Sequence, residues 1–218
     1  NYDYFKMRLP QNKTNDFDNH NFYFMPSASL YWMPDNKNTL YMTYSTNITR
    51  PTVQMLNPFV SNPNSNTIRQ GNPNLKAHYS HNVALNCFFN GPHNLSLNTS
   101  ISYTHTNNII QNHSYLGDDN KVIYTYDNMG VGHNIGVTTN LRWNAAEWLM
   151  LSANGGVGIN KLEAADIGLN QTDWYYSFAP SLDFLLPKHF RLGMNGGLYK
   201  NAPAPWTENK HIYMYSFS

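Results

Sequence analysis

The chain has 218 residues and a formal net charge of +1, and its 12% of charged residues is about half the share of a soluble domain. Near-neutral charge argues against nucleic-acid binding, which requires concentrated lysine and arginine, and the single cysteine, Cys87, excludes a disulfide framework. Asparagine occupies roughly one position in seven, well above average usage, and such uncharged polarity suits a hydrated lumen better than an ordinary water-facing surface.

Apolar residues recur at every second position along most of the chain, which indicates strands and not helices. The pattern predicts about ten strands, several of them longer than is usual in soluble sheets and close to the length that crosses a bilayer. In chain order they cover residues 1–9, 20–33, 39–49, 80–90, 94–108, 133–143, 148–160, 173–186, 189–200 and 211–218. A short pair of strands around residues 121–126 is expected to extend the hairpin of the fifth and sixth strands.

Residues 95–106 show the alternation most clearly. Successive side chains of a strand point to opposite faces, so this segment has one apolar face and one small, polar face. We expect lipid on the side of Leu95, Leu97, Ile101 and Tyr103, and a wet lumen or plug on the side of Ser96, Asn98, Ser100 and Ser102. The same rule places Cys87 on an apolar face, and Asp183 and Arg142 on polar faces toward the lumen.

The links between the predicted strands alternate between short and long. The short ones are residues 34–38, 91–93, 144–147 and 187–188, and the long ones are residues 10–19, 50–79, 109–132, 161–172 and 201–210. In an up-and-down barrel each class of link lies at one end, and outer-membrane barrels have short periplasmic turns and long extracellular loops. The sequence therefore predicts an all-β, antiparallel up-and-down transmembrane β-barrel, of which residues 1–218 form about ten strands. Closure of these strands on themselves and membership of a larger wall of about 22 strands both stay open at this stage.

Aromatic residues near the predicted strand ends are expected to form interfacial girdles. These residues are Tyr31, Trp32, Trp143, Trp148, Trp174, Tyr175 and Tyr176.

The first long link contains Thr49-Arg-Pro-Thr-Val-Gln-Met-Leu-Asn-Pro-Phe59, followed by Gln70-Gly-Asn-Pro-Asn-Leu-Lys76. Together these segments resemble the C-terminal barrel region of TonB-dependent transporters, and most closely the outer-membrane β-barrel family of gut and oral Gram-negative bacteria. The matching residues are Arg50, Pro51, Leu56, Asn57, Pro58, Phe59, Gly71, Asn72, Pro73, Asn74 and Leu75. One departure is Ala77-His78, where the family usually has Pro-Glu.

The resemblance implies a nutrient-import receptor of the bacterial cell outer membrane. Its partners would be outer-membrane lipid, an N-terminal plug domain and the remaining barrel of the same protein. Coupling to the TonB complex would use parts that this chain does not contain. Two alternatives remain at this stage: a soluble, Asn- and Tyr-rich β-sandwich that binds carbohydrate, and a barrel-anchored adhesin or assembly subunit without transport.

Few residues suggest chemistry. The three prolines of the motif stiffen its loop, and we expect the motif mainly to order a strand-to-loop transition. Contact with an unknown small ligand is predicted for Arg50, Asn57, Arg69, Asn72, Tyr115 and Trp206. No catalytic set, metal site or cofactor is expected, so the chain is predicted not to be an enzyme. Residues 117–120 suit a hairpin turn better than a calcium loop.

Overall fold

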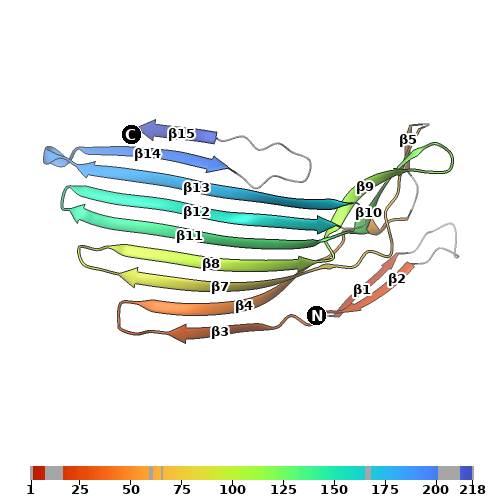
Figure 1. Ribbon diagram of the computed structural model, residues 1–218, viewed down its shortest axis with the longest axis horizontal. Helices are drawn as coiled ribbons and strands as arrows, with labels where there is room; N and C mark the ends of the chain where they lie inside the picture. The colour runs from red at the N-terminus through yellow and green to blue at the C-terminus, as the bar shows by residue number, and fades with distance from the viewer. Residues whose placement is uncertain are drawn as a thin grey trace.

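The computed structural model describes residues 2–7, 17–58, 61–64, 66–164, 168–200 and 212–217. One antiparallel sheet of nine strands dominates it, with the spatial order β15-β14-β13-β12-β11-β8-β7-β4-β3 (Figure 1). Its strands are β3 (Ser27–Trp32), β4 (Thr39–Thr49), β7 (His78–Asn90), β8 (Ser96–Asn107), β11 (Val131–Ala146), β12 (Leu149–Ala164), β13 (Leu169–Leu185), β14 (Arg191–Lys200) and β15 (Ile212–Phe217). Within this sheet, strands that follow one another along the chain are neighbours in space, which confirms the predicted up-and-down order. The sheet is open, with β3 and β15 at its edges.

Within the described residues the wall has nine strands, which agrees with the predicted number of about ten, and the first predicted strand forms outside it. β1 (Tyr2–Met7) pairs only with β2 (Phe17–Phe22), in a separate two-stranded sheet. The predicted strand 20–33 was wrong as a single element, since it divides into β2 and β3 around Pro26. Proline has no backbone N–H and a fixed φ, so it interrupts a hydrogen-bonded ladder.

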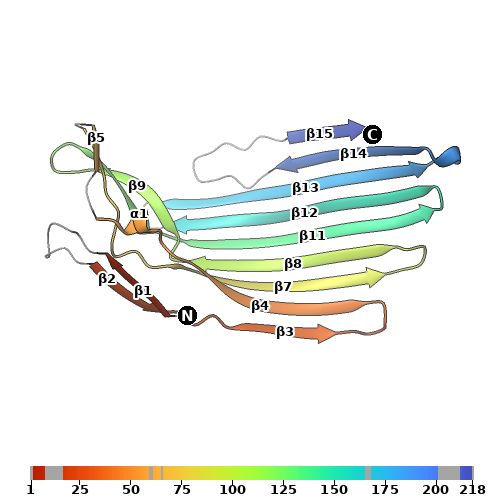
Figure 2. The same ribbon diagram turned by 180° about the vertical axis from the view of Figure 1, so that it is seen from behind.

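The short links and the two described long links, 50–79 and 109–132, lie at opposite ends of the sheet, as predicted (Figures 1 and 2). One expected long link, residues 161–172, was mostly wrong, because β12 and β13 continue their pairing to Ala164 and Leu169. The links 10–19 and 201–210 lie largely or entirely outside the described residues. No helix in the described part of the chain is both long enough and apolar enough to span a membrane.

The short turns owe their shape to local hydrogen bonds. In the β3–β4 turn, the amides of Lys37 and Asn38 both donate to Asp35 Oδ1 at 2.7 Å, and Asn38 Nδ2 donates to Asp35 Oδ2. The backbone bond from Lys37 and the side-chain bond from Asn38 hold the pKa of the Asp35 carboxyl below its usual value. In the β13–β14 turn, η3 (Pro187–His189) reverses the chain with Lys188 at φ 63°.

The two faces of the sheet differ as the alternation predicts. Residues paired in register share a face, so rows across the sheet can be compared. One row from β4 to β12 reads Met42, Leu85, Ile101, Val137 and Val157. The adjacent row on the other face reads Thr43, Ala84, Ser102, Gly136 and Gly158. Cys87 lies on the apolar face, and Arg142 and Asp183 lie on the polar face, as predicted.

The apolar face has no protein cover within the described part of the chain. Ile101, Ile135 and Val157 are 44%, 51% and 45% exposed, although each is a large apolar side chain in the middle of the sheet. The buried apolar residues lie elsewhere, mostly in the long links: Leu56, Leu75, Ala77, Met129 and Ala164. A continuous exposed apolar surface of this kind marks a contact with a membrane or with another protein.

Tryptophans mark both borders of this apolar face, with Trp32 and Trp143 toward the short turns and Trp174 toward the long links. Two residues expected in the girdles, Tyr31 and Tyr175, instead lie on the polar face, because each is adjacent in sequence to an outward-facing tryptophan.

Tyr175 lies against the backbone of two glycines on the polar face. A Cβ at Gly136 would come within 2.6 Å of the Tyr175 hydroxyl, and one at Gly158 would overlap both the ring and the Ile135 carbonyl. Asn134 Nδ2 donates to the Tyr175 hydroxyl at 3.0 Å and fixes the ring. These positions therefore require glycine because an aromatic ring covers them.

The assignment of faces can be tested with an arginine at adjacent positions. In the full-length protein, Ile101→Arg is expected to destabilise the folded state by about 2–4 kcal/mol, because the charge enters lipid. Ser100→Arg is the control and is expected to change stability by under about 1 kcal/mol, because its side chain points into water. Denaturant titration in lipid vesicles measures both. Equal costs, or a larger cost at Ser100, would contradict the assignment.

The contact between Tyr175 and its glycines gives a second test. Gly158→Ala is expected to destabilise the protein by about 1–3 kcal/mol through overpacking. Gly155→Ala, on the same strand, is the control, since its Cβ would meet atoms only at 3.4 Å and beyond and should cost under about 1 kcal/mol. The same vesicle titration separates the two, and a Gly158→Ala protein as stable as the Gly155→Ala protein would refute the overpacking account.

Candidate functional site

The two long links 50–79 and 109–132 fold together into one unit at the end of the large sheet (Figure 2). The first link supplies α1 (Val53–Leu56), β5 (Ser61–Asn64) and β6 (Thr67–Arg69), and the second supplies β9 (Ile110–Leu116) and β10 (Val122–Asn128). The strands form a four-stranded sheet with the order β5-β6-β10-β9, in which β6 and β10 are parallel. The expectation that residues 121–126 belong to a short pair that extends the hairpin of β8 and β11 is confirmed, because β9 and β10 continue that pairing from Ile110 opposite Asn128. The additional pairing of β10 with β6 was not expected. We call this unit the loop sheet.

The β9–β10 connection is a hairpin turn, as predicted for residues 117–120. The amide of Gly117 donates to the carbonyl of Lys121 at 2.9 Å, and Asn120 adopts φ 57°. Asparagine tolerates this left-handed conformation better than most residues. In the described part of the chain, no group of three His, Cys, Asp or Glu side chains is placed to hold a metal ion.

The two halves of the sequence motif are hydrogen-bonded to each other. Thr52 caps α1, and the chain beyond the helix receives bonds from the second half: Gly71 N donates to the Asn57 carbonyl and Asn72 N to the Met55 carbonyl, both at 2.7 Å. A Cβ at Gly71 would lie 2.6 Å from the Asn57 carbonyl oxygen, so glycine permits this crossing. The motif therefore joins a one-turn helix to the segment that follows β6 in the same loop.

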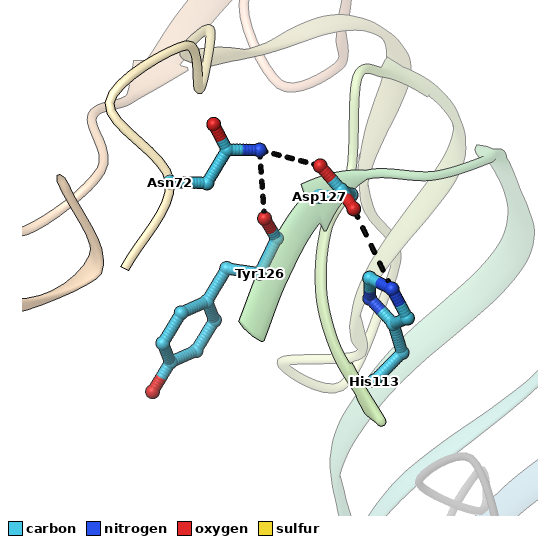
Figure 3. A network of polar contacts seen from close by, with 4 residues as sticks. All are labelled: Asn72, His113, Tyr126 and Asp127. Atoms are coloured by element: carbon cyan, nitrogen blue, oxygen red, sulfur yellow. Dashed lines mark hydrogen bonds and ion pairs between the residues drawn. The ribbon is translucent and has the colours of Figure 1, made fainter. Parts of the chain in front are cut away.

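Asn72 joins the first link to the second (Figure 3). Its Nδ2 donates to the Tyr126 carbonyl at 3.0 Å and to Asp127 Oδ1, while its Oδ1 accepts from the amide of Asn74 at 2.9 Å. The other Asp127 oxygen lies 3.5 Å from Nε2 of His113 on β9. The side-chain amide of Asn72 is therefore used within the protein.

Asn128 makes a second connection between the links. Its Oδ1 accepts from the amide of Lys76 at 2.6 Å, and its Nδ2 donates to the carbonyls of Lys76 and Asn108 at 2.8 and 2.9 Å. Close by, Leu56, Leu75, Ala77 and Met129 are buried. The loop sheet is thus stabilised by a small apolar core and by the side-chain hydrogen bonds of two asparagines.

A cleft of about 440 Å³ opens between the two links. It is lined by Gln54, Asn57, Arg69, Gln70, Gly71, Asn112, Tyr124 and Tyr126. Register explains the grouping: Asn112 pairs with Tyr126 and Tyr124 pairs with Arg69, so these four side chains share one face of the loop sheet. The guanidinium carbon of Arg69 lies 5.8 Å from the centre of the Tyr124 ring. The cleft offers amide donors and acceptors, two aromatic rings and one positive charge, which suits binding of a polar ligand.

Comparison with known proteins agrees with this architecture. The sequence matches the outer membrane protein beta-barrel family over residues 2–218. The chain belongs to this family. It is therefore a barrel protein of the bacterial outer membrane, and its apolar face meets lipid. The predicted localisation and barrel fold are confirmed, and the soluble sandwich is excluded.

A solved structure supports the same fold. The barrel protein is similar to the siderophore receptor PirA from Pseudomonas aeruginosa, with a TM-score of 0.68 and 17% sequence identity. The match covers 93% of this chain and 37% of that chain, so the barrel protein spans well under half of the receptor. No match was found among curated proteins.

The predicted ligand-contacting residues of the barrel protein lie at different places. Asn57 and Arg69 line the cleft, and Asn72 lies beside it with its side chain bonded to β10. Arg50 lies 5.7 Å from the ring of Tyr23, away from the cleft lining. Tyr115 lies on the opposite face of the loop sheet, 6.0 Å from the His113 ring. Trp206 lies outside the described residues, and ligand contact by any of the six stays a prediction.

Sequence reasoning did not find most of the cleft. Gln54, Gln70, Asn112, Tyr124 and Tyr126 were not singled out. The alternation of Tyr124 and Tyr126 in a short predicted strand was a usable signal, because it places both rings on one face. Nothing local marked the glutamines or Asn112.

The joining role of Asn72 can be tested by replacing it. Asn72→Ala is expected to destabilise the loop sheet by about 1–3 kcal/mol, because the Tyr126 carbonyl and the Asp127 carboxylate lose their donor. Faster hydrogen exchange in β10, with unchanged exchange in β11 and β12, is the expected result. Asn74→Ala is the control, since only its backbone amide takes part in the bond to Asn72. Similar exchange in both variants would show that the Asn72 side chain does not hold the links together.

Proposed function

We propose that the barrel protein forms part of the wall and the ligand-capturing loops of an outer-membrane receptor that imports a small nutrient. The observation that carries the proposal is the cleft between links 50–79 and 109–132. Two long loops that were merely covering a barrel end would not need a shared sheet, a buried core and a lined cleft. A preorganised site on joined loops is what capture of a ligand requires.

In the proposed receptor the cleft would lie where an external ligand arrives. Outer-membrane barrels have long loops outside the cell and short turns in the periplasm, so the loop sheet would face outward. Behind it, the polar face of the wall carries hydrogen-bonded amides and hydroxyls, including Thr104 to Asn82 at 2.9 Å and Gln171 to Asp173 at 2.7 Å. A ligand leaving the cleft would meet this polar face of the wall.

Transport itself would need partners outside this chain. We infer that a plug domain and further barrel strands of the same protein complete the pore, and that a TonB complex supplies energy through those parts. The likeness to PirA supports the barrel and says nothing of the ligand, because the identity is 17%. We assign the chain no catalytic step and no cofactor.

The proposal can be tested by deleting the whole gene and measuring growth and uptake on minimal media that differ in carbon and iron source. Loss of growth on one nutrient class is expected, with the same loss when the TonB complex is disrupted. Complementation with Tyr124→Ala/Tyr126→Ala should fail at low nutrient concentration, whereas Tyr115→Ala, on the opposite face of the loop sheet, should restore growth.

Surface levels of each variant must be equal for this comparison. A deletion strain that takes up every nutrient normally but loses surface adhesion or an assembled partner would contradict import. That outcome would favour the barrel-anchored adhesin or assembly subunit.

A further inference from the structure

We propose that the cleft selects ligands that are rich in oxygen and carry an anionic group such as a carboxylate, and that Arg69 recognises that group. This inference deepens the proposed function, since it rests on the cleft as the place of ligand capture. Three observations support it: the contacts of Arg69, the position of the Asp127 carboxylate and the composition of the cleft lining.

Arg69 has no acidic partner in the described part of the chain. Its recorded contact is with the Tyr124 ring, at 5.8 Å, and its side chain is exposed at the end of β6. A contact with the face of a ring uses none of the five N–H donors of a guanidinium. These donors can therefore form two parallel hydrogen bonds to a carboxylate.

The carboxylate of Asp127, on the strand beside β6, is directed away from the cleft. Asp127 follows Tyr126 on β10, so its side chain lies on the opposite face. There it accepts from Asn72 and lies 3.5 Å from His113 (Figure 3). The cleft lining therefore contains one formal charge, which is positive, and no acidic group that would repel an anion.

The rest of the cleft lining indicates the chemistry of the uncharged part of the ligand. Four side-chain amides, from Gln54, Asn57, Gln70 and Asn112, can each both donate and accept hydrogen bonds. Tyr124 and Tyr126 add rings and hydroxyls, and the lining contains no aliphatic side chain. Such a surface matches a ligand with many hydroxyl or carbonyl oxygens. Two sources share this chemistry: an acidic oligosaccharide and a negatively charged ferric siderophore.

The test measures binding to the purified full-length receptor in detergent, without any energy source. The probes are an array of carboxylated, sulfated and neutral glycans, a ferric tricatecholate of net negative charge and a ferric hydroxamate without it. Binding is expected only for anionic members, and the best binder identifies the source. Arg69→Gln should lower the affinity for it by about 10–100-fold, the usual range for a hydrogen bond to a charged group.

Two further variants control for charge and folding. Lys121→Gln removes the same charge from the β9–β10 turn, where only the Lys121 backbone carbonyl is used, and should leave the affinity unchanged. Arg69→Lys keeps the charge without the planar fork and should give an intermediate affinity. A thermal melt identical to that of the parent shows that Arg69→Gln is folded.

Binding confined to neutral probes, absence of binding by every anionic probe, or an unchanged affinity in Arg69→Gln would each overturn the inference. Because the assay needs no transport, its result is separate from that of the growth experiment. A receptor that binds anions through Arg69 but imports nothing would refute only the import proposal, and a working importer with an unchanged Arg69→Gln would refute only this one.

Discussion

Every backbone N–H and C=O group in the hydrocarbon layer must find a partner within the protein, and the antiparallel ladder from β4 to β14 is built on that constraint. Once the strands are paired in this way, each side chain can face only lipid or the lumen. The row that contains Ile101 and Val137 and the adjacent row that contains Ser102 and Gly136 follow directly. The scarcity of charged residues has the same origin, because neither lipid nor a lined lumen replaces the open water of a soluble surface.

The loop sheet is stabilised by different interactions from those of the wall. It lies beyond the wall, so its stability depends on burial and side-chain hydrogen bonds, as in a soluble domain. The buried side chains of Leu56, Leu75 and Met129 and the bonds of Asn72 and Asn128 provide both. The chain thus combines a wall whose apolar face needs lipid with a loop sheet that is stabilised by its own contacts.

The sequence predicted what depends on local periodicity and missed what depends on pairing between distant segments. A two-residue period is a local property, so the wall strands, their faces and the side of Asp183 were predictable. The break at Pro26 was readable but overlooked within a long apolar run. The cleft was not predictable, because it exists only where β6 pairs with β10, which joins Thr67 to Val122 and brings Arg69 beside Tyr124.

The sequence motif, which suggested the family, links local sequence to the pairing of distant segments. Gly71 lacks a Cβ, and this lets the return chain cross the end of α1 and bond to Met55 and Asn57 through residues 71 and 72. The preceding amide, Gln70 N, donates to the Tyr124 carbonyl at 3.1 Å. The crossing therefore fixes Gln70, and Arg69 before it, against the aromatic strand of the other link. A sequence feature that carries no chemistry of its own thereby sets the position of the one charge in the cleft.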